Sequence, residues 1–130
     1  MKQFLLLFFS FFCICTGAIA QRPPVKKTDK HPIVHYGTAS FYADKFQGRK
    51  MANGEMYDRN KLTAAANRIP LGTWVKVSNL SNKKTVIVQI TDRMHPKNRR
   101  LIDVSRAAAI KLGFIKKGLT KVSVEVINKP

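Results

Sequence analysis

Three stretches of this sequence alternate apolar and polar residues with a period of two. They span residues 74–78, 85–91 and 121–127, and their apolar positions are Val75, Val77, Val86, Val88, Ile90, Val122, Val124 and Val126. Because side chains on a strand point alternately to opposite faces, this period predicts strands with one buried face each. The polar, turn-rich segment 79–84 joins the first two stretches, so they are expected to form a β-hairpin.

One short helix is predicted among the strands. Ser105 is a suitable N-cap, residues 106–112 are rich in alanine, and Gly113 can take the left-handed conformation of a C-cap. Asp103 is assigned to the start of this helix, because a carboxylate complements its positive end. Residues 38–42 add a short strand. These elements predict a mainly β protein built as a compact barrel, although periodicity does not say which barrel.

The first twenty residues have the features of a secretory signal peptide. Lys2 supplies a positive start, residues 5–16 are mostly apolar, and Ala18 and Ala20 are small residues before the expected cleavage point. The segment is short for a membrane span, although an uncleaved anchor is the alternative. Export to the periplasm or cell envelope is expected, or secretion where the host has no outer membrane.

A linker is expected between this signal and a single folded domain. Residues 21–35 contain three prolines and little that could pack, whereas an aromatic, small-residue segment begins at Tyr36. The domain is therefore placed at residues 36–130, which is enough for one modest core.

Cysteine and histidine usage excludes several kinds of site. Cys13 and Cys15 both lie inside the predicted signal, so the mature chain is expected to have no disulfide, no thiol nucleophile and no cysteine metal site. His95 is the one histidine inside the predicted domain, and a single histidine does not make a metal site. No metal and no cofactor are predicted.

The chain is strongly basic, with 24 lysines and arginines against 7 acids and a formal net charge of +17. Such a surface attracts polyanions. Export disfavours nucleic acid, and the lack of a basic amphipathic helix disfavours anionic lipid. A cell-wall glycan fits better, because its lactyl groups carry carboxylates where stem peptides have been removed. The alternative is that the charge serves only solubility or retention near an anionic wall.

Cleavage of a glycan needs a carboxyl group that can give and take a proton. The acids of the predicted domain are Asp44, Glu55, Asp58, Asp92, Asp103 and Glu125. Glu125 lies on the outward side of its strand, Asp103 is assigned to the helix, and Asp44 lies in a loop without distinctive neighbours. Elimination therefore leaves Glu55, Asp58 and Asp92.

Each of these three acids has two interpretations. Asp92 follows a predicted inner strand, where it is either a proton donor or an acceptor of backbone hydrogen bonds that organises the next loop. The turn signal Asn53-Gly54 could aim Glu55 into a groove, with Asp58 three residues on. An exposed polar loop is the alternative for this segment.

Aromatic side chains can provide faces on which sugars stack. Most aromatic residues of a small domain belong to its core, so the candidates are limited to Tyr42, Tyr57 and Trp74. Arg93 and His95 lie in the segment that follows Asp92. With the two tyrosines they make up the predicted substrate-binding residues.

These segments together resemble the rare lipoprotein A (RlpA) family, whose domain is a double-psi β-barrel like those of expansins and barwin-like proteins. The resemblance covers roughly residues 37–126, and its motifs follow in the same order. They are GTASFY (37–42), FQGR (46–49), ANGE (52–55), YD (57–58), LTAA (62–65), IPLGT (69–73), VKVSNL (75–80), TDR (91–93), IDVSRAAA (102–109) and LG (112–113). The resemblance implies a six-stranded double-psi β-barrel with one or two short helices.

Members of this family are described as endolytic lytic transglycosylases of peptidoglycan that prefer glycan strands without stem peptides. The resemblance therefore implies a lyase that acts on these strands and leaves 1,6-anhydromuramyl ends. By motif, it assigns Asp92 as the catalytic acid and base, Glu55 as a second acid, and Asp58 as a supporting carboxylate. A monomer that binds no nucleic acid and spans no membrane after signal cleavage is expected.

Two departures from the family pattern oppose this assignment. The family usually has a histidine where this chain has Ala66, and a methyl group cannot transfer a proton. The family's Asp-Arg-Gly-Pro is replaced by Asp-Arg-Met-His-Pro at residues 92–96, which introduces His95. Rescue of Ala66 by His95 is one hypothesis, and a barrel that binds wall glycan without cutting it is the other. Retention of Asp92 and Glu55 favours the enzyme.

Overall fold

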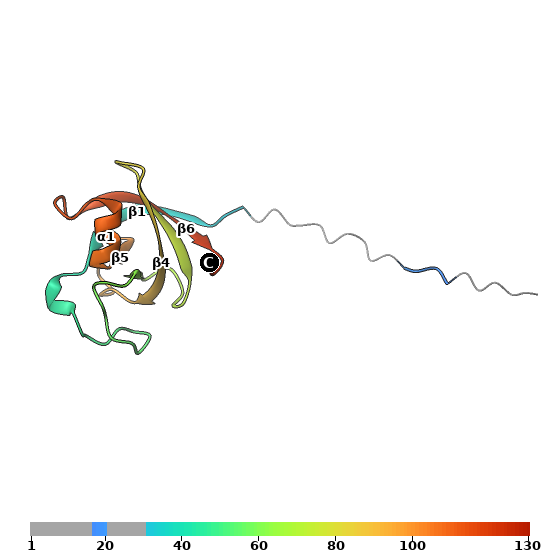
Figure 1. The fold of residues 1–130 in the computed structure, drawn as a ribbon, viewed down its shortest axis with the longest axis horizontal. Helices are drawn as coiled ribbons and strands as arrows, with labels where there is room; N and C mark the ends of the chain where they lie inside the picture. The colour runs from blue at the N-terminus through green and yellow to red at the C-terminus, as the bar shows by residue number, and fades with distance from the viewer. Residues whose placement is uncertain (1–16, 21–30) are drawn as a thin grey trace, which may run out of the picture.

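The strands of the chain close into a barrel (Figure 1). The computed structural model describes residues 17–20 and 31–130, so residues 1–16 of the predicted signal and 21–30 of the predicted linker lie outside the described residues. Its elements are β1 (Val34–Phe41), the 3-10 helix η1 (Asp44–Phe46), β2 (Thr63–Ala65), β3 (Trp74–Asn79), β4 (Thr85–Asp92), β5 (Ile102–Val104), α1 (Arg106–Leu112) and β6 (Thr120–Ile127). The predicted mainly β, six-stranded barrel with one or two short helices is confirmed.

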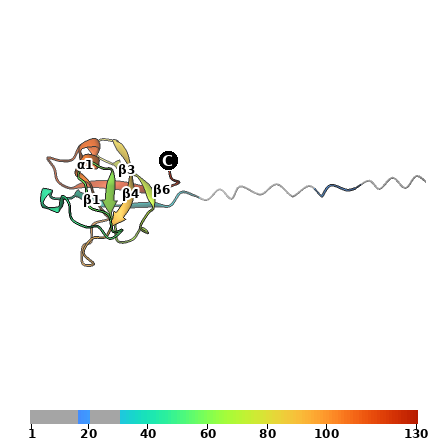
Figure 2. The same ribbon diagram turned by 60° about the horizontal axis from the view of Figure 1, so that its bottom comes forward.

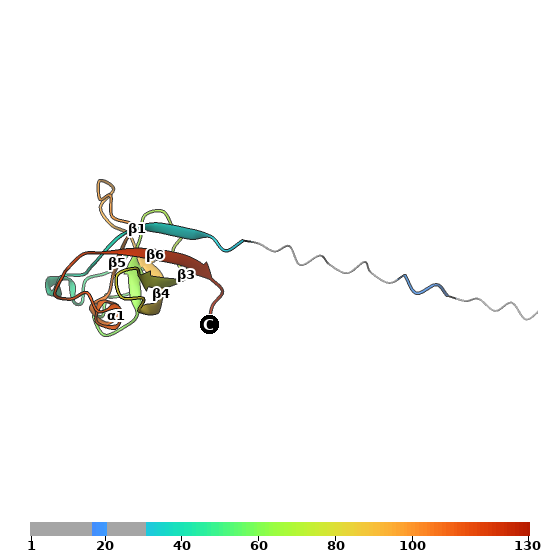
Figure 3. The same cartoon turned by 90° about the horizontal axis from the view of Figure 1, so that it is seen from above.

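The order of the strands around the barrel is β1-β5-β2-β4-β3-β6, and β6 pairs with β1 to close it. The pairs β1–β5 and β2–β4 are parallel, whereas the other neighbours are antiparallel. Figure 3 shows β1 and β6 running side by side, and Figure 2 shows α1 against the barrel wall. The parallel pairings make lateral neighbours of strands that are far apart in the sequence.

The predicted hairpin and its buried face are confirmed. Trp74 lies opposite Gln89, and Ser78 lies opposite Thr85, in the antiparallel pair β3–β4. The apolar side chains of these strands and of β6 fill the barrel. The buried ones are Val75, Val77, Val86, Val88, Ile90, Val122 and Val124, and Val126 is partly buried against them.

The first strand begins earlier than the sequence predicted. β1 starts at Val34 rather than at Thr38, and its first two residues fall in the range predicted as linker. Val34 pairs with Glu125 and His35 with Val124, both in β6. Local composition carries no signal of a partner at the other end of the chain, so the boundary could not be seen in the sequence.

The short helix has the caps that its sequence predicted. The Ser105 side chain accepts a hydrogen bond from the Ala108 amide (3.3 Å), and Gly113 has a φ of 72°. The assignment of Asp103 to the helix start is wrong, because Asp103 lies in the middle of β5. A strand of three residues is too short for its alternation to be recognised.

Close contact between β1 and the residue preceding β5 requires a glycine at position 37. A Cβ on Gly37 would lie 2.7 Å from the Cβ of Leu101. The Leu101 amide also donates to the Thr38 carbonyl at 2.9 Å, so the two backbones cannot separate without stretching this bond. Gly37 therefore lets β1 and β5 approach.

We expect Gly37→Ala to lower the free energy of unfolding by about 1–3 kcal/mol, the usual effect of overpacking. Urea denaturation of the purified protein measures this change. In a Leu101→Gly background the added methyl group no longer meets a Cβ, so Gly37→Ala should cost much less there. An equal cost in both backgrounds would contradict the steric explanation.

Candidate active site

Four strands bring Ser40, Asp103, Ala65 and Asp92 into one row across the barrel. Asp103 of β5 lies opposite Ser40 of β1 on one side and Ala65 of β2 on the other. Ala65 lies in turn opposite Asp92, the last residue of β4. Laterally paired residues project from the same face of a sheet. The two carboxylates therefore share one face, with the methyl group of Ala65 between them.

Asp92 accepts hydrogen bonds through both of its carboxylate oxygens. The Tyr42 hydroxyl donates to Oδ2 at 2.6 Å, and the amides of Ala52 and Arg93 donate to Oδ1 at 2.9 and 2.8 Å. The Ala52 donor belongs to the connection between η1 and β2, and the Arg93 donor belongs to the loop between β4 and β5. Asp92 thus organises these loops, and its carboxylate has a fixed orientation at the end of β4.

Tyr42 connects Asp92 to a small aromatic cluster. Its ring stacks on Tyr57 with centroids 4.2 Å apart and an interplanar angle of 23°, and it meets Phe46 edge-on at 5.9 Å. Burial and the hydrogen bond to Asp92 raise the pKa of Tyr42 well above its ordinary value. The hydroxyl therefore stays protonated at neutral pH and continues to donate to Asp92.

The second predicted tyrosine has a supporting position beneath the first. Tyr57 is only 2% exposed, and its hydroxyl oxygen accepts a hydrogen bond from the Arg106 amide at 3.2 Å. Burial also raises the pKa of Tyr57. So little of this ring is exposed that it supports Tyr42 at the groove rather than offering a broad face to a sugar. Trp74, the third aromatic candidate, lies on β3 and does not line the groove.

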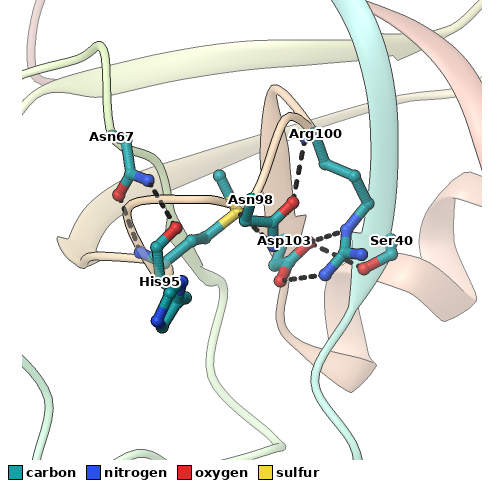
Figure 4. A network of polar contacts seen from close by, with 7 residues as sticks. Ser40, Asn67, His95, Asn98, Arg100 and Asp103 are labelled. Carbon is teal, nitrogen blue, oxygen red and sulfur yellow. Dashed lines mark hydrogen bonds and ion pairs between the residues drawn. The ribbon is translucent and has the colours of Figure 1, made fainter.

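Asp103 is a second carboxylate in the groove, although elimination from the sequence does not select it. Ser40 donates to its Oδ1 at 2.7 Å, while Arg100 donates through Nε to Oδ1 (2.9 Å) and through Nη2 to Oδ2 (3.1 Å) (Figure 4). The hydrogen bond to Asp103 raises the pKa of Arg100. A bidentate guanidinium holds the carboxylate in a defined plane.

These residues line an open groove of about 670 Å³. Its walls come from the end of β1, the connection that follows β1, the ends of β2 and β4, and the loop before β5. The lining residues are Ser40, Phe41, Tyr42, Ala43, Lys45, Phe46, Arg49, Lys50, Tyr57, Ala65, Asp92, Arg93, Met94, His95, Asn98, Arg100 and Asp103. Cationic side chains outnumber the two carboxylates, so the groove suits an anionic ligand.

The structure does not bring Glu55 and Asp58 into the lining of this groove. Glu55 is exposed in a turn, where its amide donates to Asn53 Oδ1 and its carboxylate accepts from Asn53 Nδ2 at 3.3 Å. Asp58 accepts from the Asn60 amide at 2.9 Å and shapes the next turn. Both acids therefore have hydrogen-bond partners in their own turns. Among the described residues, the turn that carries Glu55 is linked to a groove carboxylate only by the hydrogen bond from the Ala52 amide to Asp92.

Arg93 lines the groove, but its guanidinium is already engaged. Nη1 donates to the carbonyl oxygens of Ala66 (2.6 Å) and Ile69 (2.5 Å), which fixes the loop after β2. Ala66 itself is 0% exposed and belongs to the apolar core. The position where the family usually has a histidine therefore presents only backbone atoms to its polar neighbours.

His95 also lines the groove, on the loop that distinguishes this chain from the family pattern. Asn67 holds that loop from both sides, since its Oδ1 accepts from the Met94 amide (2.9 Å) and its Nδ2 donates to the His95 carbonyl (3.2 Å) (Figure 4). His95 Nδ1 accepts from the Lys97 amide at 3.1 Å, which leaves Nε2 as the protonated nitrogen of the neutral ring.

Two further kinds of feature are lacking in residues 17–20 and 31–130. That part of the chain contains no group of three or more histidines, cysteines or acids arranged to hold a metal ion. None of its helices has the length and apolar character needed to cross a membrane.

Comparison with known proteins identifies the family. Residues 34–124 match the family model described as "Lytic transglycolase". The chain belongs to this family. The matched range runs from the first residue of β1 into β6, so this lytic transglycolase domain includes every strand of the barrel and the whole groove.

Two relatives of this lytic transglycolase chain are named "Endolytic peptidoglycan transglycosylase RlpA". The protein from Neisseria meningitidis is 44% identical over 103 residues, which cover 77% of this chain and 43% of the relative. The protein from Pasteurella multocida is 50% identical over 92 residues, which cover 71% and 31%. The chain thus spans less than half the length of these relatives.

A solved structure supports the barrel assignment. The expansin of Clavibacter michiganensis superposes with a TM-score of 0.60 at 23% identity, covering 75% of this chain and 52% of that one. At this identity the likeness shows the fold alone. The resemblance to expansin barrels that the motifs implied is confirmed at that level.

The raised pKa of Tyr42 is predicted to make this lytic transglycolase domain lose stability at alkaline pH. That pKa is raised from 10.0 in the folded state, so the contribution of the Tyr42 hydroxyl is complete below about pH 10 and lost as the pH rises further. The free energy of unfolding should therefore fall more steeply above about pH 10 in the wild type than in Tyr42→Phe. Urea denaturation at each pH measures it.

Tyr36→Phe is the matched control, because Tyr36 is an exposed tyrosine of β1. Its curve should follow that of the wild type. If the Tyr42→Phe curve does the same, the folded state does not protect that hydroxyl from ionisation.

Proposed function

We propose that this chain is an endolytic transglycosylase of the cell envelope that cuts the glycan strands of peptidoglycan. The observation that carries the proposal is Asp92, fixed at the groove by Tyr42 on the same face as a second carboxylate, Asp103. The name of the relatives supports the reaction, and the predicted signal peptide supports the location. We further propose that the chain acts as a monomer, without cofactor or metal, and that it prefers glycan strands lacking stem peptides.

The proposed reaction moves one proton from Asp92 and returns one. The carboxyl group protonates the glycosidic oxygen, the bond from C1 to that oxygen breaks, and the C6 hydroxyl of the same muramyl residue attacks C1. The Asp92 carboxylate takes the proton of that hydroxyl, which closes the 1,6-anhydro ring and regenerates the acid. No water enters, so the spacing of two carboxylates that hydrolysis requires does not apply.

Asp103 is proposed as the electrostatic partner of Asp92. Positive charge develops on the sugar ring as the glycosidic bond breaks, and a carboxylate fixed on the same face stabilises it. One strand separates the two acids, and adjacent strands lie about 4.8 Å apart, so their backbones are about 10 Å apart. That spacing leaves room for a sugar ring over Ala65.

A second candidate function is a barrel that binds wall glycan without cutting it. Two observations favour it. Ala66 is buried in the core where the family usually has a histidine, and Glu55, the second acid assigned by motif, is not among the groove's lining residues. In this reading Asp92 serves as the organiser of the groove, a role that its two backbone hydrogen bonds already support.

Asp92→Asn removes the proton carrier with little change of shape, and it distinguishes the two candidates. Wild-type protein incubated with peptide-free glycan strands should release anhydro-ended products, detected by mass spectrometry. The variant should be slower by about 100- to 10,000-fold, the range for a general acid or base. Glu125→Gln, an outward acid on β6, should cut at the wild-type rate.

Once circular dichroism shows that each variant is folded, the results distinguish the enzyme from the binding barrel. A wild type that retains the strands but releases no product supports the binding barrel. An Asp92→Asn variant that cuts at the wild-type rate overturns the assignment of Asp92.

Asp103→Asn tests the second carboxylate. Loss of its charge should lower kcat by about 100-fold, as for other groups that stabilise transition-state charge, with a smaller effect on KM. Initial rates of anhydro-product release at several strand concentrations give both constants. Asp44→Asn removes a carboxylate that does not line the groove and should leave kcat unchanged; an Asp103→Asn enzyme that behaves the same way would exclude an electrostatic role.

A further inference from the structure

Arg49 differs from the other arginines of the groove. Arg93 donates to backbone carbonyls and Arg100 donates to Asp103. The Arg49 guanidinium has no hydrogen-bond acceptor and no acidic partner among the residues that the structure describes. It is thus an unpaired cation in a groove whose other guanidinium groups already bind protein atoms.

Contact with an aromatic ring gives this guanidinium a defined place. Its Cζ lies 4.8 Å from the ring centroid of Phe46, and Lys45 Nζ lies 5.3 Å from the same centroid. A cation over a ring face is held by electrostatic attraction, which leaves N–H groups free for a ligand. The structure therefore places two cations around one partly exposed ring.

The Phe46 ring also links this cation to the proposed reaction centre. Phe46 meets Tyr42 edge-on at 5.9 Å, and Tyr42 donates to Asp92 at 2.6 Å. Arg49, Phe46, Tyr42 and Asp92 all line the same groove. Arg49 therefore borders the same groove as Asp92, on the wall that carries Phe46 and Tyr42.

We propose that Arg49, with Phe46 and Lys45, binds the lactyl carboxylate of a muramyl residue that carries no stem peptide. The inference rests on the proposed function, since it assigns a substrate group to the same groove. A lactyl group combines a carboxylate with a methyl group, and the site combines a free guanidinium with an apolar ring. The planar guanidinium matches a carboxylate with two parallel hydrogen bonds.

The charge of the lactyl group explains how such a site selects strands. When a stem peptide is attached, the lactyl carboxyl becomes a neutral amide and the pairing with Arg49 is lost. Stem peptides carry carboxylates of their own, which are a second source of the same chemistry. Arg49 thus makes the removal of stem peptides a condition of tight binding.

Binding of three kinds of glycan strand to Asp92→Asn protein, which is expected to cut them far more slowly than the wild type, tests the proposal. The strands are peptide-free, peptide-free with every lactyl carboxyl converted to its methylamide, and peptide-bearing. Arg49→Gln removes the charge, Arg49→Lys retains it, and Arg68→Gln is the matched control, because Arg68 is exposed and does not line the groove. Isothermal titration calorimetry gives each Kd.

Arg49→Gln should weaken binding of peptide-free strands by roughly tenfold, as expected for a charge-assisted hydrogen bond. Arg49→Lys should recover part of this loss, and Arg68→Gln should bind as the parent does. The parent should bind methylamide strands roughly tenfold more weakly than peptide-free ones, and Arg49→Gln should cause no further loss on them.

Equal losses for Arg49→Gln on charged and methylamide strands would overturn the proposal. So would a loss confined to peptide-bearing strands, which would identify stem-peptide carboxylates as the ligand. The result is independent of cleavage: Arg49-dependent binding by a protein that makes no anhydro product refutes the transglycosylase and leaves this site intact. Cleavage by the wild type whose kcat/KM for peptide-free strands is not lowered by Arg49→Gln refutes this site and leaves the enzyme.

Discussion

A shift of one residue in the pairing of β2 with β4 decides which side chain enters the groove. Ala64 lies opposite Ile90, whereas Ala65 lies opposite Asp92, so Thr91 is passed over. Because side chains alternate between the two faces of a strand, an unshifted register would put Thr91 in the row and turn Asp92 away. Thr91 is buried instead, and its hydroxyl donates to the sulfur of Met51. Asp103 pairs with Ser40 and Ala65 on the other side of β2, so the irregularity is what brings Asp92 into the same row as Asp103.

The tyrosines tie this row to the rest of the domain. Tyr42 follows β1 directly, and its hydroxyl donates to Asp92 while its ring covers Tyr57. The Tyr57 hydroxyl accepts the first amide of α1, from Arg106. A continuous set of contacts therefore runs from the helix start through two stacked rings to the proposed catalytic carboxylate. Rigid support of this kind is what a proton donor needs in order to meet one oxygen of its substrate.

Local patterns predicted the parts of the fold that depend on local residues. The alternation at Val75, Val86 and Val122 gave the strands of the hairpin and of β6, and Ser105 with Gly113 gave the helix. Asp92 is selected as a candidate proton donor because it follows a predicted inner strand. Asp103 was misassigned because its role depends on lateral partners, Ser40 and Ala65, that lie far away in the sequence. No rule of spacing reveals which distant strands become parallel neighbours.

The surface that glycan contacts on the folded protein can be located by experiment. Two-dimensional amide NMR spectra recorded during titration with peptide-free glycan strands report this residue by residue. We expect the largest shifts at Tyr42, Ala65, Asp92 and Asp103, which share the groove. Lys76 and Glu125, paired on the outside of β3 and β6, should not move. Shifts that cluster at Lys76 and Glu125 instead would contradict the assignment of the row across β1, β5, β2 and β4 as the glycan site.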